Sequence, residues 1–265
     1  MSADQSLASL DGAIMPVGEA MLPATDEGLI RGDGVFEVIR VYDGVPFALE
    51  EHLERLQRSA ANLRLGIDLE AVRADAHRLL ATAGAGPAHE ALRIVQTRGG
   101  HRLLMTESMH ELPDRIRLTP VTYSPTRVLD GVKSLSYAAN LLARRLAQEQ
   151  GFDDALLVTP HGRVLEAPTS SVFWVKDGEI FTPPLSEHIL ASITRAIVIE
   201  VTDARERECT LESLHDADEI FLASTIREVH PVAALEQRSF DGVGPVTARA
   251  GEAVVAHIRS RLAGS

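Results

Sequence analysis

Alternating strand-like and helix-like segments are the feature of this 265-residue chain that most limits its fold. Residues 35–42 are largely apolar, reach a turn at Asp43 and Gly44 and resume at Val45, a pattern typical of a β-hairpin. Leucine and alanine at helical spacing then predict a helix over 50–64. Both patterns recur along the chain, which predicts a protein of mixed strand and helix.

The other predicted elements continue this alternation. They are a helix over 70–84, strands near 91–98, 102–106 and 115–123, a helix over 137–150, strands over 155–158, 164–166, 171–175 and 219–223, and a helix that begins near Ser192. Proline and small polar residues interrupt the apolar pattern after Tyr123. We therefore predict an N-terminal α/β domain over 1–122, a linker over 123–127 and a C-terminal domain over 128–265.

Composition disfavours several classes of partner. The net charge of −12 argues against nucleic acids and anionic membranes, because both require a basic surface. The first residues lack the pattern of a signal peptide and no apolar run approaches membrane-spanning length, so we expect a cytoplasmic protein.

Cys209 is the single cysteine, and we expect it to be buried and structural. The ten histidines form no zinc-type cluster, so we expect no metal.

Lysine is rare in this chain, where only Lys133 and Lys176 occur. Lys176 precedes an Asp-Gly turn, where a lysine normally points into water. Lys133 lies between a strand-like and a helical stretch, where desolvation would lower the pKa of its amine and allow attack on a carbonyl. Taken alone, Lys133 fits a structural role better than a catalytic one, because few lysines at such junctions are catalytic.

Several residues together match the needs of pyridoxal 5′-phosphate (PLP). PLP requires a lysine for its aldehyde, a carboxylate for its ring nitrogen, a phosphate cradle and a donor near its ring hydroxyl. Lys133 offers the amine and Glu166 the carboxylate. A helix that starts at Ser192 would point backbone N–H groups of residues 192–194 at a phosphate. Serine-hydrolase and phosphate-loop motifs are missing from the sequence.

Five segments, in order along the chain, resemble the class IV aminotransferase family. They are Arg31–Glu37, His52–Leu56, Lys133–Asn140, Gly162–Glu166 and Ser192–Arg195. The relatives include D-amino acid aminotransferases, aminodeoxychorismate lyases and branched-chain aminotransferases. The resemblance implies an α/β fold of fold-type IV, with a smaller N-terminal α/β domain, a larger barrel-like C-terminal domain that binds PLP, and a homodimer.

The resemblance also implies roles for individual residues. Lys133 would be the Schiff-base lysine, Glu166 would bind the ring nitrogen and Tyr137 the ring hydroxyl. The phosphate side of the cofactor would be bound by Arg55, Ser192, Ile193, Thr194, Ser224 and Thr225. Each has a simpler reading when taken singly: Arg55 as a solvated arginine, Glu166 as a surface carboxylate, Tyr137 as a core residue.

Substrate choice depends on positions where the relatives differ. The expected substrate-binding residues are Arg31, Phe36, Val38, Arg40, Arg98 and His101. Arg31 and Arg98 are the first candidates for a carboxylate clamp, and Arg40, Arg102 and Arg227 are further ones. Branched-chain enzymes carry glycine at the position of Val38, whereas the D-specific group carries this residue type. The Arg-x-His carboxylate trap of D-amino acid aminotransferases is absent in its usual form from residues 97–102.

We therefore expect transamination between an amino acid, with D-amino acids favoured, and a 2-oxo acid. An aminodeoxychorismate lyase is the alternative, although lyases carry asparagine at the position of Ser224, and a branched-chain aminotransferase comes third. A homologue that binds PLP without turnover is the reading from a different class. The expected partners are small amino and oxo acids, not nucleic acids or membranes.

Overall fold

The computed structural model describes residues 6–109 and 111–264, which form two compact units. Unit 1 contains the chain up to Glu111 together with Val132–Tyr137, and unit 2 contains Leu112–Gly131 and the chain from Ala138 onward. Both units combine strands with helices, so the mixed α/β class predicted from the sequence is confirmed.

Unit 1 is built on a six-stranded antiparallel sheet with the order β2-β1-β6-β5-β3-β4. Its strands are β1 (Leu7–Leu10), β2 (Ala13–Pro16), β3 (Gly34–Tyr42), β4 (Val45–Pro46), β5 (Ala91–Thr97) and β6 (Arg102–Glu107). Its helices are α1 (Glu27–Arg31), α2 (Leu49–Asn62) and α3 (Leu69–Ala83), and a 3-10 helix covers Val17–Glu19. The hairpin and both long helices of this half were predicted.

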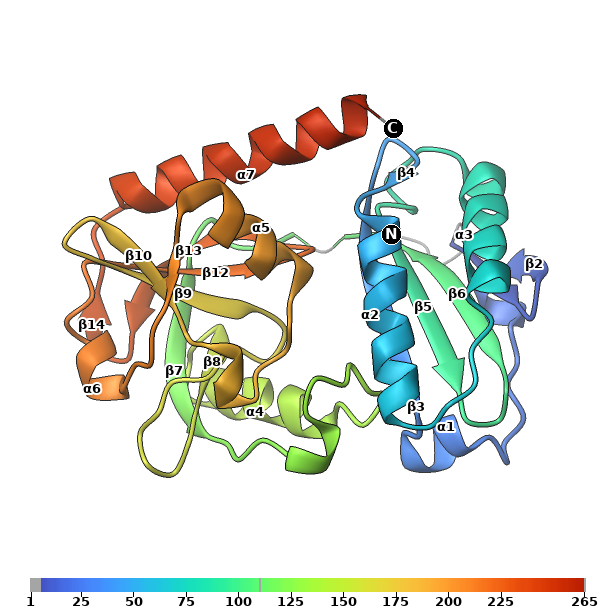
Figure 1. The fold of residues 1–265 in the computed structure, drawn as a ribbon, viewed down its shortest axis with the longest axis horizontal. Helices are drawn as coiled ribbons and strands as arrows, with labels where there is room; N and C mark the ends of the chain where they lie inside the picture. Colours follow the sequence, from blue (N-terminus) through green and yellow to red (C-terminus); the bar gives the residue numbers. More distant parts are fainter. Residues whose placement is uncertain (1–5, 110, 265) are drawn as a thin grey trace. The chain divides into compact units, whose positions relative to one another are not determined.

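Helices α2 and α3 cover one face of this sheet (Figure 1). Leu53 and Leu56 of α2 pack with Leu79 of α3 against Val35 and Ile39, and these side chains are all fully buried. Successive residues of a strand point to opposite faces. The even-numbered residues of β3 therefore lie on the face away from the helices.

A later part of the chain returns to pair with β3. The N–H of Phe36 donates to the Lys133 carbonyl over 3.1 Å, and the N–H of Leu135 donates to the Gly34 carbonyl over 2.9 Å. A side chain at Gly34 would clash, since its Cβ would lie 2.6 Å from a methyl carbon of Leu135 and 2.5 Å from the carbonyl oxygen of Gln96. Backbone bonds thus fix the lysine segment, and glycine at position 34 allows the close approach.

Unit 2 is built on an eight-stranded sheet with the order β11-β10-β9-β12-β13-β7-β8, and β14 pairs with β13. Its strands are β7 (Ile116–Thr122), β8 (Asp154–Val158), β9 (Ser171–Lys176), β10 (Glu179–Thr182), β11 (Arg205–Glu206), β12 (Glu219–Ser224), β13 (Glu228–Leu235) and β14 (Arg238–Ser239). Its helices are α4 (Ala138–Glu149), α5 (Ile193–Thr202), α6 (Leu211–Leu214) and α7 (Pro245–Ala263), with 3-10 helices at Arg127–Leu129 and Leu185–Glu187.

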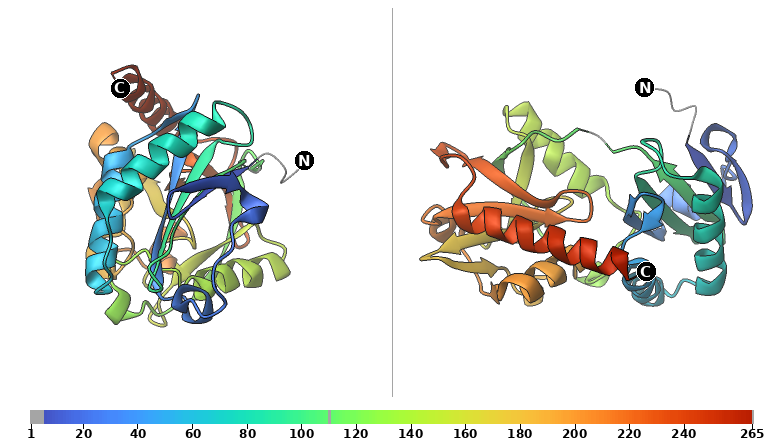
Figure 2. Two further views of the ribbon diagram at one scale, coloured as in Figure 1. Left: turned by 90° about the vertical axis from the view of Figure 1, so that its right-hand side faces the viewer. Right: turned by 90° about the horizontal axis from the view of Figure 1, so that it is seen from above.

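The helices of unit 2 contact different strands of its sheet. Helices α5 and α7 contact each other as well as β12, and α7 also contacts β13, whereas α4 contacts β7 and β8 (Figure 2). Within the described part of the chain, no helix combines the length and apolar character needed to cross a membrane.

The division into units differs from the predicted domain boundaries. Strand β7 was expected in the N-terminal domain, but it pairs in parallel with β8 and with β13 of unit 2. The predicted linker at 123–127 also lies within unit 2, where the N–H of Tyr123 donates to the Val158 carbonyl over 2.7 Å. An apolar strand pattern shows that a segment joins a sheet but not which sheet it joins, so sequence alone misplaced this boundary.

Candidate active site

The Lys133 amine lies beside two aromatic rings of unit 1. Its Nζ is 4.5 Å from the centre of the Phe36 ring and 5.6 Å from that of Tyr137. The two rings meet edge to face, with centroids 5.3 Å apart. The backbone N–H of Lys133 also donates to the Ser59 hydroxyl over 3.1 Å. The amine thus has a fixed position next to β3.

Lys176 has a different setting, as expected for a turn. It ends β9 just before the β9–β10 turn, donates to the Asp216 carbonyl over 2.9 Å and lies 3.6 Å from the Asp218 carboxylate. Of the two lysines, only Lys133 therefore lies against aromatic rings.

A buried cluster of Glu37, Arg55 and His52 forms between β3 and α2. The Arg55 Nε and Nη2 donate to the two oxygens of Glu37 over 2.7 and 2.6 Å. The His52 Nδ1 lies 2.8 Å from one of the same oxygens. Arg55 and His52 are three residues apart on α2, so both face β3. All three side chains are buried, which contradicts the reading of Arg55 as a solvated helix arginine.

The surroundings of this cluster fix its charges. Burial opposes ionisation of Glu37, but the Arg55 guanidinium and His52 outweigh it and lower the pKa of Glu37 to about 2. Burial also lowers the pKa of His52 despite the nearby Glu37 carboxylate, and the Arg55 and Lys133 charges lower it further. At neutral pH, Glu37 is charged and holds the planar Arg55 fork in one orientation.

Glu166 of unit 2 lies close to the segment that leads into α5. The Leu190 N–H lies 3.4 and 3.3 Å from the two carboxylate oxygens of Glu166. Burial, followed by the charge of Glu166, raises the pKa of the Tyr123 hydroxyl. The Glu166 carbonyl accepts a hydrogen bond from the Leu157 N–H of β8 over 2.8 Å. Glu166 is therefore held at a defined place beside β8.

Helix α5 begins where the sequence predicts. The Ser192 hydroxyl accepts a hydrogen bond from the Arg195 N–H over 3.2 Å and thus caps the helix. Ile193 and Thr194 are the first two helical residues, whose N–H groups have no carbonyl partner within the helix. The positive end of the helix dipole adds to these donors, so the first turn suits an anion.

Two more predicted residues lie at the turn between β12 and β13. Ser224 ends β12, and its hydroxyl accepts a hydrogen bond from the Arg227 N–H over 3.2 Å. Thr225 is the next residue. The predicted cofactor ligands therefore fall into two sets. Unit 1 contributes Arg55, Lys133 and Tyr137, whereas unit 2 contributes Glu166, Ser192, Ile193, Thr194, Ser224 and Thr225.

The expected substrate residues Phe36, Val38 and Arg40 lie on one face of β3. Arg93 of β5, which sequence analysis did not single out, is the cross-strand partner of Val38. Its guanidinium lies 5.9 Å from the Phe36 ring and pairs with Glu107. The period-two pattern of β5 places Arg93 on one of two faces, but only its register with β3 brings it next to Val38.

Arg98 already uses its guanidinium within unit 1. Its Nε and Nη2 donate to Asp33 over 3.0 and 3.2 Å, and its Nη1 and Nη2 donate to the Arg64 and Leu63 carbonyls over 2.8 and 2.7 Å. Those carbonyls lie just past the end of α2. This arrangement weighs against Arg98 as a substrate ligand and explains the residue as an anchor between α2 and β3.

Arg31 and His101 also contact acidic residues of unit 1. The Arg31 side chain is 73% exposed and lies 3.2 Å from Glu27 on the same short helix. The His101 Nδ1 lies 2.8 Å from Asp11 in the loop between β1 and β2. Among the described residues of unit 1, neither side chain makes a contact that links it to Lys133.

Cys209 is buried, as predicted, and burial raises the pKa of its thiol to about 11. Such a thiol stays protonated at neutral pH and is a poor nucleophile. Among the described residues, no group of three or more histidine, cysteine, aspartate or glutamate side chains is arranged to hold a metal ion.

Comparison with known proteins identifies the family. Residues 34–235 match the family described as amino-transferase class IV. The chain belongs to the class IV aminotransferase family. It is 35% identical to a putative branched-chain-amino-acid aminotransferase of Methanocaldococcus jannaschii, with 90% of this chain and 91% of that protein covered. It is 32% identical to a D-alanine aminotransferase of Listeria innocua, with 87% and 89% covered.

Solved structures show the same fold. A hypothetical aminotransferase from Mycobacterium tuberculosis, in an α-ketoglutarate and PMP bound form, superposes with a TM-score of 0.88 at 29% identity, covering 96% of this chain and 99% of that one. The fold is that of the fold-type IV transaminases, as predicted. This class IV aminotransferase is a PLP-dependent enzyme, because PLP is the cofactor of the family.

The side chains of this chain fit the chemistry of PLP. Unit 1 presents an amine beside aromatic rings and a buried, oriented guanidinium. Unit 2 presents a carboxylate and a serine-capped helix start. These are the groups that a pyridine aldehyde with a phosphate ester requires. Glu37 and His52, which orient Arg55, were missed at the sequence level, although helical spacing already placed His52 beside Arg55.

The charged state of Glu37 predicts how stability depends on pH. Because its pKa is lowered from 4.5 to about 2 in the folded protein, it stabilises the fold fully above pH 4.5, and this contribution is lost as pH falls toward 2. The difference in unfolding free energy between wild type and Glu37→Gln should therefore shrink by about 2 kcal/mol between pH 4.5 and 3. Urea unfolding followed by far-UV circular dichroism, which reports on both units, measures this difference.

Asp75 provides a matched control, since it is also a buried carboxylate of unit 1 that binds two arginines, Arg78 and Arg102. Asp75→Asn should destabilise the protein but leave its PLP affinity unchanged. Glu37→Gln should weaken PLP binding as well, because Arg55 loses its orientation. Equal PLP affinity in both variants would refute the link between Glu37 and Arg55 function.

Proposed function

We propose that the protein transfers amino groups from D-amino acids to 2-oxo acids. The observation that carries this proposal is the face of β3 next to Lys133, where Phe36 contacts the amine and Val38 follows two residues later. The side chain of Val38 fills a place that glycine leaves open in branched-chain enzymes. Arg40 brings positive charge to the same face, whereas the charge of Arg93 is balanced by Glu107. The 32% identity to the D-alanine aminotransferase of Listeria innocua supports the same preference.

We propose the following roles for the cofactor ligands. PLP, when bound, supplies an electron-withdrawing ring that stabilises negative charge on the α-carbon of the donor. Glu166 would keep the ring nitrogen protonated and Tyr137 would donate to the ring hydroxyl. Arg55 of unit 1 would be one phosphate ligand, and unit 2 would supply the others from the α5 start and the β12–β13 turn, namely Ser192, Ile193, Thr194, Ser224 and Thr225.

Lys133 has two tasks in this proposal. Its Nζ would hold the cofactor through the aldehyde group, and its amine would move a proton away from the α-carbon of the donor. Burial lowers the pKa of His52, so its ring competes little for that proton. The amino donor and the 2-oxo acid acceptor both carry a carboxylate group. We propose that Arg40 binds this carboxylate, with Arg31, Arg98 and His101 as weaker candidates.

A branched-chain aminotransferase is the second candidate. It is favoured by the relative from Methanocaldococcus jannaschii, which is 35% identical over most of both chains. The two candidates share the cofactor machinery and differ in how they hold the donor side chain. Position 38 is therefore the place to separate them.

We also propose that the enzyme is a homodimer. Leu141, Leu142 and Leu146 are exposed on α4, and such a cluster on one helix is typical of a protein contact surface. Light scattering should give twice the monomer mass of 28.7 kDa. Leu142→Glu with Leu146→Glu should shift the protein toward monomer, whereas Val243→Glu, at another exposed apolar position, should not. A wild type that stays monomeric at high concentration would refute this proposal.

The assignment of Lys133 can be tested without an activity assay. Borohydride reduction of the PLP-loaded enzyme should attach the cofactor to the peptide that contains Lys133, as seen by mass spectrometry. Lys133→Ala should lose this attachment and all turnover. Lys176→Ala is the matched control, because it removes the other lysine of the chain and should keep both. Attachment at Lys176 would overturn the site.

Donor preference is tested with both enantiomers of alanine, glutamate and leucine. We expect D-alanine or D-glutamate to react fastest, with 2-oxoglutarate or pyruvate as acceptor, and L-leucine weakly or not at all. Val38→Gly should raise the rate with L-leucine. Arg40→Met should raise the KM of the donor by about ten- to a hundredfold, because a charged hydrogen-bond pair is lost.

Three results would contradict the proposal once aminodeoxychorismate is added to this panel as a further substrate. Faster turnover of L-leucine than of any D-amino acid would identify a branched-chain aminotransferase. Release of pyruvate from aminodeoxychorismate alone would identify a lyase. A PLP-loaded enzyme that converts no amine would indicate a binding protein without turnover.

A further inference from the structure

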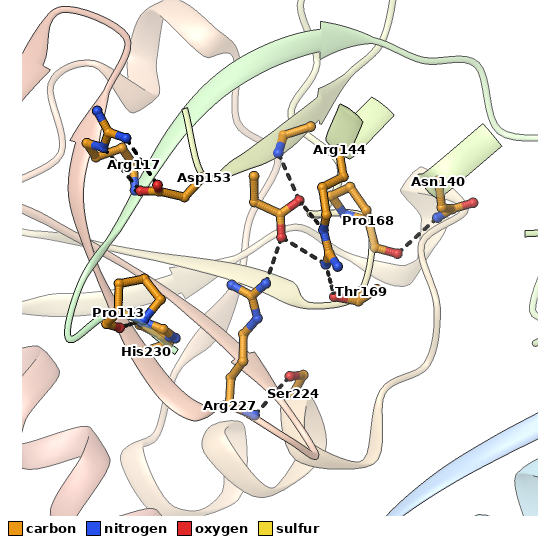
Figure 3. Close-up of polar contacts among 12 residues, drawn as sticks. Pro113, Arg117, Asn140, Arg144, Asp153, Pro168, Thr169, Ser224, Arg227 and His230 are labelled. Atoms are coloured by element: carbon orange, nitrogen blue, oxygen red, sulfur yellow. Dashed lines mark hydrogen bonds and ion pairs between the residues drawn. The ribbon is translucent and has the colours of Figure 1, made fainter. Parts of the chain in front are cut away.

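Arg227 forms a buried ion pair that ties one turn of unit 2 to the start of β8. The residue lies between β12 and β13, two positions after Thr225, and its side chain is 8% exposed. Its Nη2 donates to the Asp154 carboxylate over 2.7 Å. Arg144 of α4 donates to the same carboxylate over 3.1 Å from both Nε and Nη2 (Figure 3). Asp154 is fully buried.

This cluster holds more positive than negative charge. Two guanidinium groups share one carboxylate, although Arg144 is partly exposed and also donates to Thr169 over 2.7 Å. The Arg227 Nη1 is buried without a hydrogen-bond partner in the part of the chain that the structure describes. Burial of unpaired donors and surplus charge is unfavourable, so fold stability alone gives no reason for an arginine at position 227.

The turn contains a residue in an uncommon backbone conformation. Glu228, the residue after Arg227, has a φ of +53°, a value that residues other than glycine rarely adopt. Inside the turn, the Arg227 N–H donates to the Ser224 hydroxyl. The Arg227 guanidinium extends from the same residue to Asp154 (Figure 3). The ion pair with Asp154 therefore restrains the turn, which also contains Ser224 and Thr225.

We propose that Arg227 is a positioning residue for the phosphate group of the cofactor. Its ion pair with Asp154 fixes the turn that carries Ser224 and Thr225, and its surplus charge favours a phosphate monoester there. This inference rests on the proposed role of Thr225 as a phosphate ligand. Arg227 touches neither the reacting atoms nor the substrate in this proposal, which differs from its sequence-level reading as a carboxylate clamp.

The neighbouring pair Arg117 and Asp153 offers a matched control (Figure 3). Asp153 directly precedes Asp154 and accepts from the Arg117 Nε and Nη2 over 3.2 and 3.1 Å. The pair thus has the same chemistry, but the Arg117 side chain is 52% exposed. Its strand, β7, contains none of the predicted cofactor residues.

The test compares binding of PLP with binding of pyridoxal, which lacks the phosphate. Apo protein is titrated with each compound, and the absorbance of the bound aldehyde is measured. Arg227→Met should weaken PLP binding about tenfold and leave pyridoxal binding within about twofold of wild type. Arg227→Lys should restore part of the loss because it keeps the charge. Arg117→Met should change neither affinity.

Asp154→Asn and Thr225→Ala complete the design. Asp154→Asn should reproduce the selective loss of PLP affinity, and it provides a second variant if Arg227→Met does not fold by circular dichroism. Equal weakening of PLP and pyridoxal in the Arg227 and Asp154 variants would reveal a general structural role and overturn the inference.

Thr225→Ala distinguishes failure of the inference about Arg227 from failure of the proposed function on which it rests. If Thr225→Ala loses PLP affinity selectively while Arg227→Met does not, the inference fails and the proposed function stands. If neither variant discriminates between PLP and pyridoxal, the assignment of the turn to the phosphate fails, and the inference falls with it.

Discussion

Backbone pairing between the lysine segment and β3 is the constraint on which the rest of unit 1 depends. Val132–Tyr137 returns to β3 after the chain has left for unit 2, and its carbonyl and N–H groups bond to Phe36 and Gly34. A lysine on a free loop would lose its position to side-chain and backbone entropy. Here Lys133 is held by main-chain bonds beside the Phe36 ring, so its amine is placed before any ligand arrives.

The second organising feature is an ion pair in which the arginine and the carboxylate are both buried, and among the described residues each unit has one such pair. Glu37 holds Arg55, and Asp154 holds Arg227. Removing ions from water costs about as much as their attraction returns, so neither pair is explained by stability alone. What a carboxylate gives a guanidinium is a fixed plane and direction. Both arginines belong to elements that carry proposed phosphate ligands, where direction matters more than net binding energy.

Sequence patterns predicted the parts of this structure that depend on local chemistry. The helical spacing around Leu53 and Leu56, the serine that caps α5 and the unusual Lys133 all follow from neighbouring residues. The role of Glu37 could not be predicted. Strand alternation places its carboxylate on the buried face of β3, but the pattern does not reveal its partners, which come from α2. The sheet to which β7 belongs and the contacts of Arg98 depend on pairing between distant segments, which no local pattern specifies.

Strand β3 separates the function of the enzyme onto two faces. Its odd-numbered residues pack against α2 and include Glu37, which orients Arg55. Its even-numbered residues, such as Val38 and Arg40, lie on the other face next to Arg93. A substitution at position 38 therefore makes no direct change to the buried ion pair of Glu37 and Arg55, which lies on the opposite face of the strand.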